Sequence, residues 1–325
     1  MTDNQVANLL PPPRTGAIPI NQPQQVEQID SQTPFINNSH IRQTSTVARG
    51  CFHFDLKSGR FAFQVPLHNN SSFGRSGISC LTQLKQFSFY QALISEFVGT
   101  MFLTLFACST GLPIGRRQEV PDLHGILVGG LTLSTLIVCF GHVSGCNINP
   151  AVTLSLLFAC HIDIIRTICY IAVQLLGAFC GSCLLKSLAP TIAREKLGVT
   201  NISEGVTVQQ AFIVELIITF ILCYTILAAC DKNREDVGGS KALSIGIALI
   251  IGSLFGGPYS GGSMNPARSF GPAAVAGIWK NHWIYWFGPI TGGVAAAICY
   301  NHILKQRIIP QPVVESYPLK ILSKV

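Results

Sequence analysis

Long apolar runs recur along the chain after Phe87 and determine the secondary structure that we expect. Six of them approach the roughly 20 residues with which a helix spans the hydrocarbon core of a membrane. They are about Tyr90–Leu112, Gly125–Gly141, Ile164–Leu185, Ala211–Cys230, Ala242–Phe255 and Trp283–Leu304, of which the fifth is short by hydropathy alone. Because a helix satisfies its own backbone hydrogen bonds in lipid, the pattern predicts an all-α membrane protein with six transmembrane helices.

Polar residues dominate the first 85 positions instead. This stretch is rich in Gln, Asn, Ser, Thr and Pro and shows almost no sustained apolar periodicity. Such a composition buries too little surface to offset the entropy of ordering, so we expect a mostly disordered tail over 1–85. Within it, Cys51–Val65 alternates aromatic and polar residues. This segment is either a partner-binding or membrane-surface element, or simply loose tail with scattered aromatic side chains. The membrane domain should cover 86–306, followed by a C-terminal tail over 307–325.

Composition and charge placement support a membrane protein and give its orientation. The chain is 48% hydrophobic and only 11% charged, which is too apolar for an ordinary soluble domain. Fifteen Lys and Arg residues fall in the tails and in the loops on the same side of the membrane, against six on the opposite side. This excess predicts that both termini are cytoplasmic. The net charge of +7 is therefore mainly a topology signal, and no basic stripe indicates a nucleic-acid partner.

One sequence motif, Ser-Gly followed after a few residues by Asn-Pro-Ala, occurs twice. It reads "SGCNINPAV" at Ser144–Val152 and "SGGSMNPAR" at Ser260–Arg268. Asn is a favoured N-cap, and Pro is favoured at the first helical position, where its missing N–H is no loss. Each copy should therefore start a short helix over the apolar stretches Val152–Ala159 and Ser269–Ala276. About 10 residues reach roughly 15 Å, half of the ~30 Å hydrocarbon core. We expect two re-entrant half-helices, buried in protein or lining a water-filled cavity.

The two halves of the membrane domain match more widely, as repeats over about 86–190 and 205–306. Glu96 in the first span corresponds to Glu215 in the fourth. We expect these intramembrane carboxylates to be structural, accepting hydrogen bonds from the backbone of the re-entrant loops. Three spans and one half-helix per repeat give an odd number of passes, so the second repeat should be inverted and the half-helices should enter from opposite faces.

The N-termini of the two half-helices should then meet near the membrane midplane. Each contributes about half a positive charge from its dipole. The side chains of Asn149 and Asn265 can accept from backbone N–H groups and still offer N–H donors to a lumen. A passing water or other neutral molecule would find donors there, whereas a cation or hydrated proton would meet a positive barrier.

The stretch from about Gln86 to Leu304 resembles the major intrinsic protein family, and within it the orthodox animal aquaporins. The resemblance rests on "CFGHVSGCNINPAVTL" at Cys139–Leu154, "SMNPARSFGPA" at Ser263–Ala273 and "NHWIYWFGP" at Asn281–Pro289. It implies a passive channel for water in which the motifs Asn149-Pro150-Ala151 and Asn265-Pro266-Ala267 line the pore. Positive half-helix ends exclude protons and cations in channels of this type. The resemblance also implies a homotetramer with one pore per subunit, residence in the plasma membrane, and no cofactor.

The narrowest ring of the pore departs from the orthodox pattern. In the family this ring comprises an aromatic residue, a His, a small residue and the Arg that follows the second motif. Carried across without gaps, these positions are Gly129, Ser253, Gly262 and Arg268. Loss of the aromatic and imidazole rings should widen the constriction and admit small neutral solutes such as glycerol and urea. The small-residue ring is similar to that of plant channels for silicic and boric acids, and a His-to-Ser change resembles insect glycerol channels. Alternatively, bulky neighbouring side chains refill the gap and the channel is strictly water-selective.

Other classes of protein fit the sequence less well. An ion channel would need rings of carbonyls or carboxylates, and neither a filter motif nor acidic pore residues are present. A poorly conducting structural or junctional protein could share the scaffold, and a swelling assay would separate it. No nucleophile–base pair or cluster of His and Cys indicates an enzyme or a metal site. Asn201, in "NIS" of the third-to-fourth loop, is a candidate for N-glycosylation if that loop is extracellular.

Overall fold

The computed structural model describes residues 51–55, 60–64, 82–112, 123–195, 197–232, 234, 236 and 238–304. The chain divides into two units, Met1–Ser45 and Thr46–Val325, and the first lies outside the described residues. Most of the predicted N-terminal tail and the C-terminal tail over 307–325 also lie outside them.

Five long helices match the first five predicted spans. They are α2 (Phe87–Ser109), α3 (Leu123–Ser144), α5 (Ile164–Leu188), α6 (Val208–Cys230) and α7 (Lys241–Ser260), each long and apolar enough to cross a membrane. The fifth is longer than its hydropathy suggested, because the helix continues through Gly256, Gly257 and Pro258 and ends at Gly261, whose φ is +83°. Glycine adopts this left-handed conformation without strain, which allows the helix to stop there.

The sixth predicted span is built from two pieces. Helix α9 (Ile284–Cys299) has 16 residues, and a π-helical segment, η3 (Tyr300–Leu304), continues it. Tyr300 donates its hydroxyl hydrogen to Asp231 Oδ2 at 2.8 Å and so anchors this end to the segment that follows α6. The two pieces together cover the predicted Trp283–Leu304.

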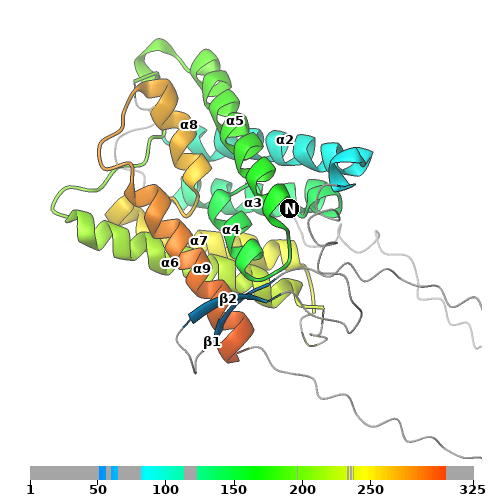
Figure 1. The fold of residues 1–325 in the computed structure, drawn as a ribbon. Helices are drawn as coiled ribbons and strands as arrows, with labels where there is room; N and C mark the ends of the chain where they lie inside the picture. Colours follow the sequence, from blue (N-terminus) through cyan, green and yellow to red (C-terminus); the bar gives the residue numbers. More distant parts are fainter. Residues whose placement is uncertain are drawn as a thin grey trace, which may run out of the picture. The chain divides into compact units, whose positions relative to one another are not determined.

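Two short helices lie between the long ones. Helix α4 (Pro150–Phe158) has nine residues and α8 (Pro266–Ala276) has eleven. Each packs mainly against a long helix of the other repeat: α4 against α9, and α8 against α5 (Figure 1). The long helices pair in a matching way, α2 with α5 and α6 with α9, while α3 packs against α7 across the repeats. Each repeat therefore packs its half-helix against a long helix of the other repeat.

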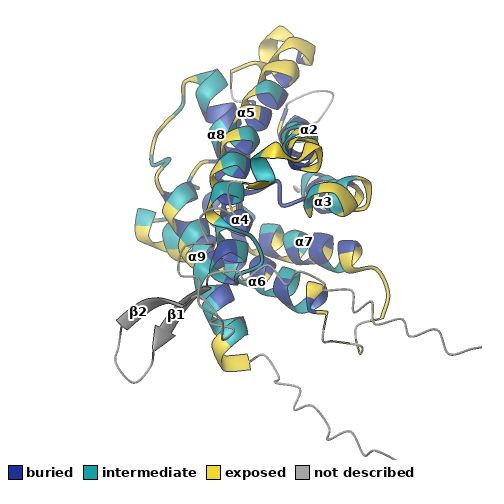
Figure 2. Ribbon diagram, turned by 45° about the vertical axis from the view of Figure 1, so that its right-hand side comes forward, coloured by how far each residue is buried: buried dark blue, intermediate teal, exposed yellow. Residues whose placement is uncertain are grey.

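Residues between the helices are buried, and residues on the outer faces of the helices are exposed (Figure 2). A central cluster joins both repeats and includes Leu103, Leu133, Ile148, Leu222 and Met264. Large apolar side chains such as Ile94 and Val138 are 63% and 69% exposed on the outside. An apolar exterior of this kind is stable in lipid and would aggregate in water.

Strands occur where the sequence analysis expected mostly disorder. Strands β1 (Cys51–Asp55) and β2 (Arg60–Gln64) form an antiparallel hairpin in which Cys51 pairs with Gln64 and Asp55 with Arg60. The expectation of a disordered tail did not include this hairpin. The alternation of aromatic and polar residues in the stretch has the period of a strand, and this period is the signal that would have predicted it.

Candidate functional site: a central cavity between two half-helices

Each half-helix begins at the proline of the repeated motif. Asn149 and Asn265 are the N-caps, with extended backbones that precede Pro150 and Pro266. Asn149 Oδ1 accepts from Ala151 N–H at 2.8 Å, and Asn265 Oδ1 accepts from Ala267 N–H at 2.9 Å. The side-chain oxygen thus satisfies a helix-end donor that has no partner within its own helix.

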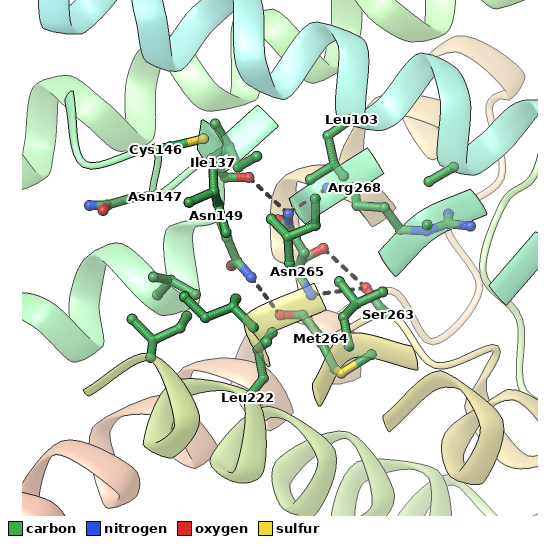
Figure 3. Close-up of a pocket in the computed structure, with 18 of the residues that line it drawn as sticks. Leu103, Ile137, Cys146, Asn147, Asn149, Leu222, Ser263, Met264, Asn265 and Arg268 are labelled. Carbon is green, nitrogen blue, oxygen red and sulfur yellow. Dashed lines mark hydrogen bonds between the residues drawn. The ribbon is translucent and has the colours of Figure 1, made fainter. Parts of the chain in front are cut away.

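The same two asparagines tie the half-helices together. Asn149 Nδ2 donates to the carbonyl of Met264 at 2.8 Å, and Asn265 Nδ2 donates to the carbonyl of Ile148 at 2.9 Å (Figure 3). Each amide group carries two N–H donors, so one remains after this bond. Because both asparagines line the central cavity, the remaining donors are available to a molecule inside it.

The turns that lead into the half-helices repeat the same unusual backbone. Three positions have positive φ in the first turn and the three corresponding positions have it in the second: Gly145, Cys146 and Ile148 at 93°, 51° and 41°, and Gly261, Gly262 and Met264 at 83°, 61° and 53°. Positive φ is costly for a β-branched residue such as Ile148. Such strain persists only where the surrounding structure holds the turn in place.

Two buried carboxylates hold these turns. Glu96 accepts from Asn147 N–H at 2.9 Å and from Ile148 N–H at 2.7 Å. Glu215 accepts from Ser263 N–H at 2.8 Å and from Met264 N–H at 2.9 Å. Neither glutamate lines the cavity, and both are fully buried. The geometry is that of a structural clamp on each turn.

Side chains that the sequence analysis did not identify complete each clamp. Ser144 donates to Glu96 at 2.7 Å, and Ser260 donates to Glu215 at 2.6 Å. A tyrosine from a different helix fixes the carbonyl of each serine: Tyr170 reaches Ser144 at 3.0 Å, and Tyr285 reaches Ser260 at 2.8 Å. The tyrosines occupy different positions in the two repeats, so an internal alignment does not find them.

The cavity has a volume of about 1540 Å³ and is lined by residues from both repeats. Asn149 and Asn265 lie on facing segments within it, with the apolar side chains of Leu103, Ile137 and Leu222 around them (Figure 3). Among the described residues that line the cavity, Asp163 is the only carboxylate. The part of the chain that the structure describes contains no group of three or more His, Cys, Asp or Glu residues placed to hold a metal ion.

All four residues expected in the constriction line this cavity: Gly129, Ser253, Gly262 and Arg268. A Cβ atom added to Gly262 would lie 3.2 Å from Ser253 Cα, so these two residues adjoin. A Cβ atom on Gly129 would have one neighbour within 4 Å, the side chain of Leu249 at 3.5 Å. The point from which a side chain would extend at Gly129 therefore adjoins Leu249, a residue that the sequence did not single out.

Arg268 is held by a loop that the sequence analysis also missed. Its Nη1 donates to the carbonyl of Gly198 at 2.7 Å. Gly198 has φ of +68°, and an added Cβ would lie 2.6 Å from the carbonyl oxygen of Cys108 at the end of α2. Only glycine fits this close approach. The adjoining Thr200 shares a 2.8 Å hydrogen bond with Ser269 of α8, so the loop is fixed at the mouth of the cavity.

Asn201, the candidate glycosylation site, belongs to the same loop. It is exposed and lines the mouth of the cavity, and its side chain donates to the carbonyl of Val199 at 3.4 Å. The backbone of this asparagine lies 3.6 Å from the position of a Cβ on Gly261, at the start of the turn that leads into α8.

Comparison with known proteins identifies relatives over the whole helical region. Residues 83–300 match the family described as "Major intrinsic protein". Aquaporin-4 from Dipodomys merriami is 42% identical over 219 residues, which cover 66% of this chain and 68% of the relative. Aquaporin-2 from Bos taurus is 40% identical over 68% of this chain and 82% of its own. The lens fiber major intrinsic protein from Oryctolagus cuniculus is 41% identical over 70% and 86%.

One solved structure supports the predicted fold class. The aquaglyceroporin from Plasmodium falciparum aligns with a TM-score of 0.60 and 24% identity, covering 67% of this chain and 97% of that one. At this identity the likeness concerns the fold. The prediction of six transmembrane helices and two re-entrant half-helices, arranged as an inverted repeat, is confirmed.

Proposed function

The chain belongs to the major intrinsic protein family, and on that premise we propose that its pore passes glycerol and urea as well as water. Family membership makes it a multi-pass membrane channel for water and not an enzyme. The wider solute range follows from the small residues at three positions of the expected constriction, Gly129, Ser253 and Gly262.

The open space beside Gly129 is the observation that carries this proposal. Gly129 has no side chain, Ser253 has a small one, and Gly262 has none, so three of the four ring positions leave the lumen wide. Arg268 Nη1 donates to the carbonyl of Gly198 at 2.7 Å, and the guanidinium keeps further N–H donors while the carbonyl keeps a second lone pair. A polyol or urea can exchange hydrogen bonds with these groups as it passes, as water does.

Rejection of ions rests on the positive ends of the half-helices. The N-termini of α4 and α8 meet where Asn149 and Asn265 each donate a hydrogen bond to the opposite turn. Each helix N-terminus carries about half a positive charge. The Arg268 guanidinium adds a full charge at the constriction. With Asp163 the only described carboxylate on the wall, a cation or hydrated proton meets a barrier at two levels.

The charge distribution and the family support a proposal for orientation and assembly. The excess of Lys and Arg on the side of both termini supports a cytoplasmic location for them, with Asn201 on the extracellular side. The channel resides in the plasma membrane as a homotetramer with one pore per subunit. Exposed apolar side chains on α3, such as Leu131 at 50%, supply surface for lipid or for a neighbouring subunit.

One observation favours a narrower alternative. Leu249 lies where it can take up part of the space beside Gly129, which would make the protein a strictly water-selective channel. A poorly conducting structural protein of the same fold is the remaining alternative. The three possibilities differ in what crosses the membrane, so flux measurements separate them.

The test compares the wild type with the double variant Gly129→Phe/Ser253→His in vesicles of matched protein content. Gly262 is left unchanged because an added Cβ would lie 3.2 Å from the nitrogen of Gly257 and from Ser253 Cα. We expect the wild type to pass water, glycerol and urea, and the double variant to keep most water flux while losing glycerol flux about tenfold. Val138→Phe, on the exposed face of α3, is the control for an added aromatic ring.

Three results would contradict the proposal in different ways. Water flux without glycerol or urea flux in the wild type would establish the water-selective alternative. Absence of any flux from correctly folded protein would favour the structural alternative. Equal glycerol flux through both proteins would mean that the constriction lies elsewhere along the cavity.

A further inference from the structure

Leu249 lies beside Gly129, the position at which orthodox channels carry an aromatic residue. It is half-buried on α7 and lines the cavity, and its Cδ2 lies 3.5 Å from the position of a Cβ on Gly129. Among the described residues, leaving aside the two that flank Gly129 in the chain, no other side chain comes within 4 Å of that position. Leu249 also precedes Ser253 by four residues on the same helix, so the two side chains lie on one face of α7.

Close packing of α3 against α7 keeps Leu249 in this place. A Cβ on Gly130 would lie 2.6 Å from the carbonyl oxygen of Gly246, and a Cβ on Gly246 would lie 2.5 Å from that of Gly130. The two backbones therefore touch at these glycines. With Gly130 and Gly246 facing each other, Gly129 and Leu249 are both directed to the cavity, where they lie side by side.

The other residues of the expected ring differ from Leu249 in how they are held. Arg268 is fixed by the carbonyl of Gly198 at 2.7 Å, and Gly262 adjoins the backbone of Ser253. The Arg268 side chain is thus held by a loop carbonyl, and Gly262 has no side chain to move. A leucine side chain, in contrast, has the size to fill part of the space of a phenylalanine ring and rotates about two bonds.

We propose that Leu249 sets the width of the constriction in place of the missing aromatic residue, and so determines the largest neutral solute that passes. This inference rests on the proposed function and names a specificity-determining residue for it. Leu249 acts as an apolar wall of the cavity, against which the carbon chain of a polyol slides while its hydroxyl groups face polar groups such as Arg268. The size of residue 249 should therefore determine the solute limit, with little effect on water.

The experiment measures water, glycerol and erythritol flux through Leu249→Ala and Leu249→Phe in vesicles. The matched controls are Leu254→Ala and Leu254→Phe, because Leu254 lies on the same helix and is 47% exposed on the outer side. We expect Leu249→Phe to lower glycerol flux about tenfold and water flux less than about threefold. Leu249→Ala should raise erythritol flux relative to glycerol about tenfold. The controls should match the wild type.

Failure of this inference and failure of the proposed function give different results. If the wild type excludes glycerol, the proposed solute range is wrong, and the inference then requires that Leu249→Ala admits glycerol. If both Leu249 variants keep the wild-type ratios of water, glycerol and erythritol, Leu249 does not set the width. Should Leu249→Ala fail to give folded channel, Leu249→Val tests the same prediction with a smaller change in volume.

Discussion

Replacement of the buried glutamates by glutamine should destabilise the channel without changing which solutes it selects. Glu96 accepts four hydrogen bonds, from Ser144, Asn147, Ile148 and Gln174, and Glu215 accepts three. A glutamine side chain has one oxygen and one NH₂ group. Its NH₂ group would stand where the second carboxylate oxygen was, and there it would face an N–H or O–H donor. Each substitution therefore leaves at least one buried N–H group without an acceptor.

The magnitude follows from the bonds that are lost. A hydrogen bond to a charged group contributes about 1.5–3 kcal/mol, and an unsatisfied buried donor costs about 1–3 kcal/mol, so we expect a loss of roughly 2–5 kcal/mol for each variant. Glu96→Gln should be the more damaging of the two. It removes hydrogen bonds from the turn at Ile148, a β-branched residue with φ of +41°. Without these bonds, nothing offsets the cost of this backbone conformation.

The assay is thermal denaturation of the purified channel, combined with water and glycerol flux per folded protein. Glu204→Gln is the matched control, because Glu204 is an exposed carboxylate in the loop before α6. We expect a lower midpoint for Glu96→Gln and Glu215→Gln, unchanged flux ratios, and no effect in the control. Wild-type stability with an altered ratio of glycerol to water would refute the clamp and make the carboxylate a pore group.

The remaining predictions concern charge, backbone and surface modification. Arg268→Val should leave water flux intact and weaken the rejection of cations, measured as conductance in planar bilayers; unchanged rejection would assign that role to the half-helices alone. Gly198→Ala should destabilise by roughly 2–5 kcal/mol, because positive φ and a clash with Cys108 add together, whereas Gly205→Ala, with φ of +80° and open space around it, should cost only about 1–2 kcal/mol. Equal losses in thermal denaturation would refute the close approach of the loop. Asn201→Gln should remove any glycan seen as a mass shift after expression in cells, and a shift that persists would place the modification elsewhere.

Local sequence was sufficient to predict the elements that carry the function. The asparagine caps at Asn149 and Asn265 and the helices that follow them depend on residues adjacent in the chain. The hydropathy of the long spans placed the bundle in a membrane. Where the prediction was inexact, a local feature was responsible: α7 extends through Pro258, and the sixth span changes to π-helical geometry at Tyr300.

Contacts between distant segments could not be predicted in the same way. The loop carbonyl of Gly198 reaches Arg268 across seventy residues, and nothing in the loop sequence marks it as a partner. Leu249 approaches Gly129 only because α3 and α7 touch at two glycines. Carrying the ring positions over from the family gave four residues that line the cavity, but not Leu249, the side chain that adjoins Gly129.

The most direct test of the central claim is the response of channel-containing vesicles to a sudden inward gradient of glycerol, imposed by adding glycerol outside. A channel for water and glycerol should give a fast shrinkage, as water leaves, followed by reswelling as glycerol enters and draws water back. Vesicles challenged with an impermeant sugar should shrink at the same rate and stay shrunken. If glycerol also produced shrinkage without reswelling beyond that of protein-free vesicles, the open ring at Gly129 and Ser253 would not admit it, and the account would be contradicted.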